Sequence, residues 1–216
     1  MTVSGSEPPH NREMPQILDE TGEFEQQDLQ ELGRFVLEDL LSTEEDISWL
    51  KSIRICKDDP HWNYKGYWQA DLRFDSKKIV NIVAEIVLNY FYVKGFPRKQ
   101  RLREIKKTLA HEYGHHWPLS YLLVNGQLTN IWEERLPEVY YQLRKLDPQS
   151  CACDYSQGWS RCDKEILAED YRVLFAPAPY NEHHRMVMSN PGTLRFPDEA
   201  IKHYIKGLSN FSKHST

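Results

Sequence analysis

Leu-Ala-His-Glu-Tyr-Gly-His-His, residues 109–116, is the segment around which the rest of this sequence is interpreted. His111 and His115 are four positions apart, so on an α-helix their side chains lie on one face, one turn apart. Two imidazoles in this arrangement can bind one Zn²⁺, and Glu112 beside them can act as a general base. Because so short a pattern also arises by chance, the surrounding sequence has to decide whether it is a metal site.

The sequence before the two histidines has helical periodicity. Its apolar residues fall on a stripe roughly opposite His111 and His115, as expected for a core-packed helix that turns two ligands toward a cleft. These residues are Leu102, Ile105, Leu109 and Tyr113. Gly114 costs about 1 kcal/mol relative to Ala in a helix, which indicates a need for space beside the metal. The alternative is a His-rich helix C-terminus, where cationic imidazoles interact favourably with the helix dipole.

A second segment, Lys164 to Arg172, can supply the third protein ligand that a catalytic zinc site requires. On a helix, Glu165, Glu169 and Arg172 share one stripe that is separate from the apolar one. If Glu165 binds zinc, Glu169 can accept the free N–H of a ligand imidazole and fix its orientation. Asp163 is expected to cap the start of this helix, which places Glu165 in the first turn. The alternative is an acidic helix with both carboxylates in water.

The two segments together resemble a known family of peptidases. His-Glu-Tyr-Gly-His at residues 111–115 and Glu-Ile-Leu-Ala-Glu-Asp-Tyr-Arg at residues 165–172 are similar to the paired motifs of gluzincins related to the anthrax lethal factor catalytic domain. That family combines H-E-x-G-H with a later E-x-x-A-E-x-[FY]-R helix. The resemblance covers roughly residues 102–208, because residues 194–201 also look like the closing helix of such domains. The first hundred residues match only in general layout.

This resemblance implies a role for each residue of the site. It implies one Zn²⁺ per chain, with three ligands: His111, His115 and Glu165. It also implies that Glu112 is the general base and that Glu169 orients a ligand imidazole. The family uses a Tyr a few residues before the third ligand to stabilise the oxyanion. Here the register differs, because Tyr155 lies ten residues before Glu165 and Trp159 is nearer; Tyr155 is the candidate for this role.

Composition limits the class of protein. The chain has 216 residues, enough for one domain with a substantial core, and a formal net charge of −5. This charge gives no reason to expect nucleic acid or an anionic membrane as a partner. A basic run at residues 98–107 is expected to be a solvated helix surface, with a site for an acidic ligand as the alternative. The sequence shows no apolar signal-peptide core and no run of ~20 apolar residues, so a cytoplasmic location is expected.

The remaining sequence predicts an α+β fold, and the resemblance implies that this fold is zincin-like. Residues 1–22 are expected to form a disordered tail and residues 23–216 a single domain. In that domain a small twisted mixed sheet packs on the metal helix, and a C-terminal helical subdomain supplies the third ligand. Strand 79–88 is expected to be the edge strand above the cleft, where it can bind an extended peptide. Helices are predicted at 26–41, 43–50, 98–116, 131–146 on either side of Pro137, and 163–175, and strands at 52–57, 67–74 and 79–88.

Two further groups of residues have the composition of metal ligands. Cys151, Cys153 and Cys162 can offer three thiolates to a second, structural zinc, but no fourth ligand has suitable spacing, so free thiols are expected. His183 and His184 could reach the cleft, but a surface loop that follows two prolines explains them as well, and they are assigned no role.

These motifs predict a zinc-dependent metallopeptidase whose partner is a peptide or protein substrate. Zinc polarises the scissile carbonyl and its bound water, and Glu112 removes the proton of that water. One alternative is a regulator resembling the cytosolic ImmA/IrrE proteins, which cleave a single repressor partner. Another is a zinc-binding module without turnover. Glu112 argues against the module, because a structural site is normally closed by a fourth protein ligand and needs no base.

Overall fold

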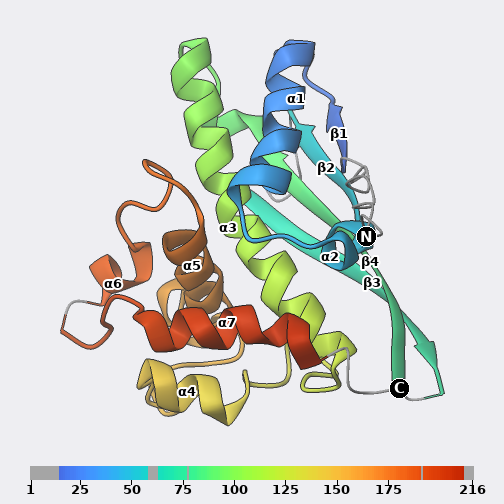
Figure 1. Ribbon diagram of the computed structural model, residues 1–216. Coiled ribbons are helices and arrows are strands. Elements are labelled where there is room, and N and C mark those ends of the chain that lie inside the picture. Colours follow the sequence, from blue (N-terminus) through green and yellow to red (C-terminus); the bar gives the residue numbers. More distant parts are fainter. Residues whose placement is uncertain (1–14, 58–62, 77, 191, 212–216) are drawn as a thin grey trace, which may run out of the picture.

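The computed structural model describes residues 15–57, 63–76, 78–190 and 192–211. Within these ranges the chain has a mixed α/β fold, with a four-stranded sheet covered on one face by helices and followed by a group of C-terminal helices (Figure 1). This arrangement agrees with the expected α+β class.

The sheet has the strand order β1-β2-β4-β3, so β1 and β3 are its edges. The strands are β1 (Gln16–Asp19), β2 (Leu50–Cys56), β3 (Gly66–Asp75) and β4 (Lys78–Asn89). β1, β2 and β4 are parallel, and β3 is antiparallel to β4. The expectation that residues 79–88 form an edge strand is therefore wrong. Their dense apolar composition fits a strand that is paired on both sides and buried, whereas β3 alternates in exposure, as an edge strand does.

β1 also corrects the expectation of a disordered tail over residues 1–22. It pairs in parallel with residues 52–55 of β2. The Asp19 carboxylate then accepts hydrogen bonds from the backbone N–H groups of Thr21 at 2.8 Å and Phe24 at 3.1 Å, which fixes the turn into the next helix. Backbone hydrogen bonds to β2 thus order β1, a segment too short to show the alternation of apolar and polar residues that predicts a strand. Residues 1–14 of the predicted tail lie outside the described residues.

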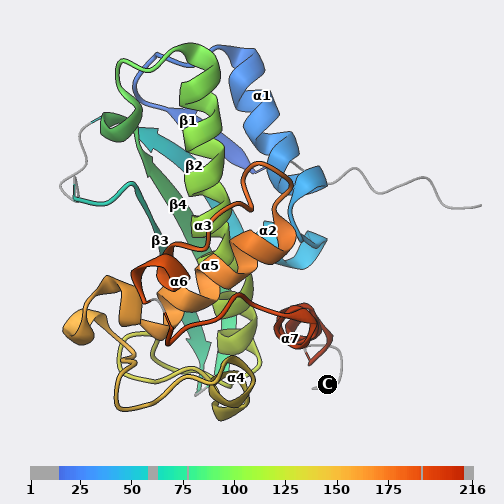
Figure 2. The same cartoon turned by 90° about the vertical axis from the view of Figure 1, so that its left-hand side faces the viewer.

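One face of the sheet is covered by α1 (Gln26–Arg34) and the long α3 (Arg98–Val124) (Figures 1 and 2). α1 continues into a π-helical turn, η1 (Phe35–Asp39), and α2 (Glu44–Trp49) begins after its cap residue Thr43, as the sequence predicts. Alternate residues of β2 and β4 point toward these helices and form a continuous apolar core with them. Its fully buried members include Leu32, Phe35, Ile53, Ile55, Ala84, Ile86, Leu88 and Leu109.

α3 extends beyond His116, to Val124, so the two predicted ligands lie in the middle of a helix and not at its end. His115 and His116 therefore do not lie at the C-terminus of the helix, and the alternative that their charges interact with the helix dipole there is ruled out. Pro118 removes one helical N–H, but residues 105, 106 and 109–123 are buried, and packing offsets that cost. No helix in the described part of the chain, α3 included, is long and apolar enough to cross a membrane.

The C-terminal helices are α4 (Glu138–Arg144), α5 (Asp163–Phe175), α6 (Arg185–Ser189) and α7 (Glu199–Phe211). Of these, α5 and α7 pack against α3, α4 packs against α7, and α6 packs against α5 (Figure 2). α5 has the predicted bounds. The helix predicted on the N-terminal side of Pro137 is wrong, because residues 131–134 form a turn and a bend. The segment 194–201, which looked like a closing helix, is mostly irregular, and the last helix begins at residue 199. Short helical turns complete the chain: η2 (Tyr90–Val93), η3 (Tyr155–Gln157) and η4 (Trp159–Arg161).

Two residues of the basic run at the start of α3, Arg98 and Lys106, pair with acidic residues of α1, whereas Lys99 and Arg103 are exposed as expected. Arg98 donates to the Asp28 carboxylate through Nε and Nη2, at 3.1 and 2.9 Å. Lys106 is 7% exposed and its ammonium lies 2.6 Å from Glu31. These pairs hold α1 against α3, because the acidic stripe of one helix faces the basic stripe of the other.

Candidate active site

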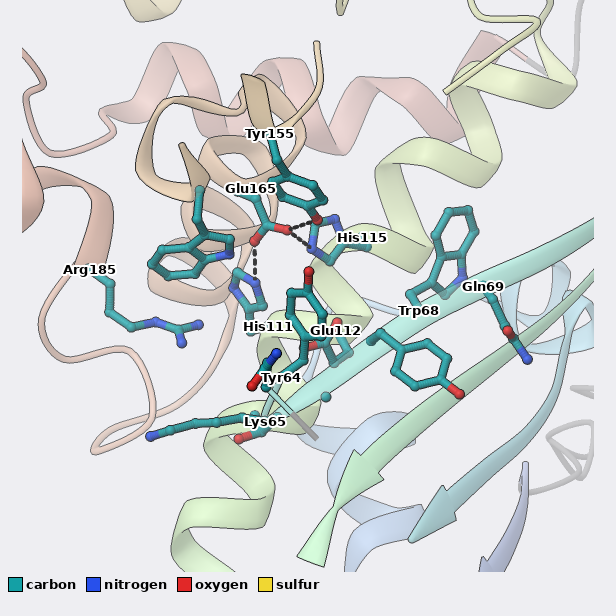
Figure 3. A pocket seen from close by; sticks show the side chains of 15 residues that line it. Tyr64, Lys65, Trp68, Gln69, His111, Glu112, His115, Tyr155, Glu165 and Arg185 are labelled. Carbon is teal, nitrogen blue, oxygen red and sulfur yellow. Dashed lines mark hydrogen bonds and ion pairs between the residues drawn. The ribbon is translucent and has the colours of Figure 1, made fainter. Parts of the chain in front are cut away.

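α3 and α5 bring the two predicted motifs together. Among the described residues, one group of three side chains is placed to hold a metal ion, with ligand atoms within 4.8 Å of one another: His111, His115 and Glu165. Nε2 of His111 lies 3.0 Å from Oε2 of Glu165, and Nε2 of His115 lies 3.5 Å from Oε1 (Figure 3). All three are 9% exposed or less.

These separations and donor types fit a zinc ion. Zinc binds imidazole nitrogen and carboxylate oxygen at about 2.0–2.2 Å in a tetrahedron, which places neighbouring ligand atoms about 3.3 Å apart. The distances of 3.0 and 3.5 Å lie on either side of that value. Burial raises the pKa of Glu165, but the charge of His115 and a hydrogen bond to His111 outweigh it and hold that pKa well below its usual range. Glu165 is therefore an ionised carboxylate, the form that binds metal.

Glu169 lies one turn after Glu165 and is fully buried. Its Oε2 is 3.0 Å from Nδ1 of His111, and its Oε1 accepts from Nη2 of Arg172 at 2.7 Å. Burial raises the pKa of Glu169, but the hydrogen bonds from His111 and Arg172 outweigh it and lower that pKa far below its usual range. A carboxylate on Nδ1 fixes the proton there, so the Nε2 lone pair of His111 points at Glu165 and the metal position. The structure thus places Glu165 and Glu169 as the sequence predicts.

Gly114 provides space for a helix crossing, and not for the metal as the sequence suggested. A Cβ at this position would overlap the backbone carbonyl oxygen of Ala168 in α5 and lie 3.0 Å from the carbonyl carbon. The two helices therefore approach backbone to backbone at the position between His111 and His115 on α3 and between Glu165 and Glu169 on α5. This contact sets the distance between the two motifs.

Glu112 lies on the cleft side of α3, next to the metal position (Figure 3). Burial raises its pKa to about 8, and Glu165 adds to this effect, whereas His115 opposes it. Space for this side chain depends on Gly66 of β3, where a Cβ would lie 3.0 Å from Cγ of Glu112 and 2.9 Å from Cγ2 of Thr108. Gly66 is a site residue that the sequence analysis missed, because only the pairing of β3 beside α3 reveals its close approach.

Tyr155 faces the same cleft. Its hydroxyl donates to Oε1 of Glu165 at 2.7 Å. Asp154 holds the preceding turn by accepting from the N–H of Ser156 at 3.0 Å, which presents Tyr155 toward α5. Trp159 also lines the cleft, and its ring lies 6.3 Å from the His111 ring between centroids. Of the two candidates for the oxyanion role, Tyr155 has its polar group beside a predicted metal ligand.

The cleft has a volume of about 560 Å³ and lies between β3 and the loop that precedes α5. Its floor is the metal group. The wall formed by β3 and the segment before it contains residues 63–69, and the opposite wall contains Tyr155, Trp159 and Arg185 (Figure 3). An edge strand therefore borders the metal position, as expected for strand addition by a peptide, but that strand is β3 and not residues 79–88.

β3 is held to the metal helix through His116, another residue the sequence analysis assigned no role. The indole N–H of Trp68 donates to Nδ1 of His116 at 3.2 Å, and Nε2 of His116 donates to the backbone oxygen of Asp46 at 2.8 Å. Burial lowers the pKa of His116 to about 4, so the ring is neutral, as these two bonds require. His115 and His116 thus have different tasks, because successive helix positions face different directions.

Asp163 does not cap α5. The cap position is Cys162, and the Asp163 carboxylate instead accepts from the N–H of Leu136 at 2.9 Å and the hydroxyl of Tyr141 at 3.0 Å. It therefore fastens the start of α5 to the segment around α4. Glu165 still occupies the first turn, although for a different reason from the one predicted.

His184 is fully buried, contrary to the expected surface loop. Its Nε2 lies 2.7 Å from Oδ1 of Asp170. The same carboxylate accepts from Nε of Arg144 and from the hydroxyl of Tyr140, each at 2.8 Å. This network joins α4, α5 and the start of α6, and none of its members lines the cleft. No periodic pattern indicates it, because its members come from separate segments.

The four cysteines are free thiols. Cys56, Cys151 and Cys162 are buried and Cys153 is partly exposed. Cys162 pairs with Ala152 in an isolated parallel bridge, which ties the loop carrying Tyr155 to the start of α5. The cysteines lie outside the group that can hold a metal among the described residues.

Comparisons with known proteins do not assign the chain. No protein-family model, no curated protein and no solved structure was found to match it. The functional argument therefore depends on the chemistry of the site itself.

Proposed function

We propose that this protein is a zinc-dependent metallopeptidase with a zincin-like fold, similar in its site to the gluzincins related to the anthrax lethal factor catalytic domain. The observation that supports it most strongly is the buried group His111, His115 and Glu165, which opens on a cleft with Glu112 beside it. Two imidazoles and one carboxylate are the ligand set of a catalytic zinc site that keeps a fourth position open.

Each residue near the metal position has a chemical task. Zinc, when bound, would supply a Lewis acid that polarises the scissile carbonyl and lowers the pKa of a water. Glu112, whose raised pKa the charge of a bound zinc would lower, accepts in its ionised form the proton of the attacking water and passes it to the leaving amine. Glu169 keeps the His111 ring in the tautomer that binds metal. Tyr155 is the candidate to donate a hydrogen bond to the oxyanion once its hydroxyl leaves Glu165.

The position of β3 supports a peptide as the substrate. It is an edge strand, and the segment from Asn63 to Gln69 borders the cleft over its length. An extended peptide can add to such an edge through backbone hydrogen bonds, which carries its scissile bond past the metal. The bond from Trp68 to His116 keeps that edge at a fixed distance from α3.

Zinc analysis and peptide cleavage by a Glu112 variant test this function. We expect about one zinc per chain in the wild type and in Glu112→Gln, and a loss of turnover by orders of magnitude in the variant alone. Glu104→Gln is the matched control, because Glu104 lies two turns earlier on α3, outside the cleft.

The two measurements separate the possible failures. A folded wild-type chain that binds no zinc would refute the metal site. A chain that binds zinc but cleaves no peptide or protein would be a binding module, and equal turnover in Glu112→Gln and the wild type would remove Glu112 from the mechanism.

A further inference from the structure

Arg185, the first residue of α6, lies at one end of the cleft in an unusual charge environment. Its backbone N–H donates to Oε1 of Glu169 at 2.8 Å, and its Nε and Nη2 donate to the two carboxylate oxygens at 3.2 and 3.1 Å. Its guanidinium lies over the Trp159 ring, 5.2 Å from the centroid. Among the described residues no partner is found for its Nη1, and the side chain is 32% exposed on the cleft.

Glu169 does not pair with Arg185 alone. The same carboxylate also binds Arg172, whose side chain is fully buried. Two guanidinium groups therefore share one carboxylate.

A second cation lines the same end of the cleft. Lys65 precedes Gly66 at the start of β3, is exposed, and has no ion pair among the described residues. In Figure 3 the side chains of Lys65 and Arg185 lie at the left-hand end of the pocket, whereas Trp68 and Gln69 lie toward the right. One cation thus comes from each wall of the cleft.

We propose that this end of the cleft is a subsite for a carboxylate of the peptide substrate, with Arg185 and Lys65 as the residues that determine specificity. This inference rests on the proposed peptidase function. The carboxylate comes from an Asp or Glu side chain or from the C-terminus of the peptide. Arg185 offers one free arm of a guanidinium that is already held in place by Glu169 and Trp159, so little side-chain entropy is lost on binding.

Paired peptides measure this preference directly. The probe is a set of Ala-based hexapeptides in which a single Glu is moved along the chain, each compared with its Gln counterpart and with its C-terminally amidated form. Their binding to zinc-loaded Glu112→Gln is followed by the fluorescence of Trp68 and Trp159, and their cleavage by the wild type is measured as kcat/KM. At one position relative to the scissile bond we expect Glu to be favoured over Gln by about tenfold, the size typical of a hydrogen bond to a charged group. A preference that depends only on the free C-terminus identifies the terminal carboxylate as the ligand.

Charge variants connect the preference to the two cations. Lys65→Glu removes no ion pair of the described residues and should reduce the Glu preference to below about twofold and favour Lys at that position. Arg185→Gln should abolish the preference, and Arg185→Lys should keep part of it. Lys94→Glu makes the same charge change on an exposed residue outside the cleft and should have no effect.

The outcomes distinguish the subsite from the peptidase function. Cleavage without any preference for Glu or a free C-terminus refutes the subsite and leaves the peptidase standing. Charge-dependent binding by a chain that cleaves no peptide or protein supports the subsite and refutes the peptidase. A zinc-loaded chain that neither binds nor cleaves any peptide of the set refutes the subsite, and it refutes the peptidase as well if no protein is cleaved.

Discussion

Replacing Gly114 by Ala should weaken both the fold and the metal site, although Ala is the better helix former. In an unconstrained helix this change stabilises by up to about 1 kcal/mol. Here the new methyl group would overlap the Ala168 carbonyl of α5 and come within 3.0 Å of two further backbone atoms. Neither backbone can yield as a flexible side chain does, so α5 has to move away from α3 by roughly 1 Å to reach ordinary contact distance.

The expected magnitude follows from these two opposing effects. Overpacking costs about 1–3 kcal/mol, and a contact between two helix backbones belongs at the upper end of that range. After subtraction of the helix-propensity gain, a net loss of about 2 kcal/mol in the free energy of unfolding remains. The same displacement lengthens the 3.0 Å separations of His111 from Glu165 and Glu169, so zinc affinity should fall by about 10–100-fold, as when an imidazole loses its orienting partner.

Urea unfolding of the metal-free chain and zinc titration measure the two effects. Gly207→Ala is the matched control, because Gly207 lies inside α7 and a Cβ there meets no atom within 4 Å. It should stabilise the chain slightly and leave zinc binding unchanged. If Gly114→Ala unfolds at the same urea concentration as the wild type and binds zinc equally well, the contact between α3 and α5 does not set the geometry of the site.

Two further variants test the buried carboxylates. Glu165→Gln should lose zinc more completely than Glu169→Gln, because it removes a candidate ligand, whereas loss of an orienting partner typically costs about 10–100-fold; titrations in the reverse order would exchange their roles. Asp46→Asn should change the pH dependence of stability, because burial raises the pKa of Asp46 to about 6 from 3.8. The folded chain therefore binds this proton more tightly than the unfolded chain does. Protonated Asp46 contributes about 3 kcal/mol to the free energy of unfolding below pH 4, and this contribution is lost as the pH rises through 6. Urea unfolding of the metal-free chains at pH 4.5 and 7 should show a smaller loss in Asp46→Asn, and equal losses would contradict the assignment.

The parts of the site that could be predicted from the sequence are those fixed by helix geometry. His111 and His115 share a face because a helix repeats every 3.6 residues, and the same rule places Glu169 one turn from Glu165. The bounds of α5 follow from its apolar stripe and from the two prolines after it. The periodicity of the sequence thus predicts which side chains share a face of each helix.

What could not be predicted depends on contacts between segments that are distant in sequence. The edge position of β3 is decided by which strands pair, and residues 79–88 by themselves read as a strand in any position of the sheet. β1 is ordered by hydrogen bonds to β2, and its four residues are too few to show a period of their own. The burial of His184 depends on Asp170 and Arg144, which lie in two other helices.

The departures from local rules concentrate where α3 crosses α5. Gly114 lies in the middle of the long helix α3. Three carboxylates are buried near the crossing: Glu112 on α3, and Glu165 and Glu169 one turn apart on α5. A buried carboxylate is stabilising only while its partners remain, and removing one of them typically costs several kcal/mol. An apolar crossing of similar volume would hold these helices together at lower cost, so packing alone does not explain the arrangement. The divalent cation that we propose between His111, His115 and Glu165 would explain it, because the cation would compensate the carboxylates and would require the imidazole tautomer that Glu169 imposes.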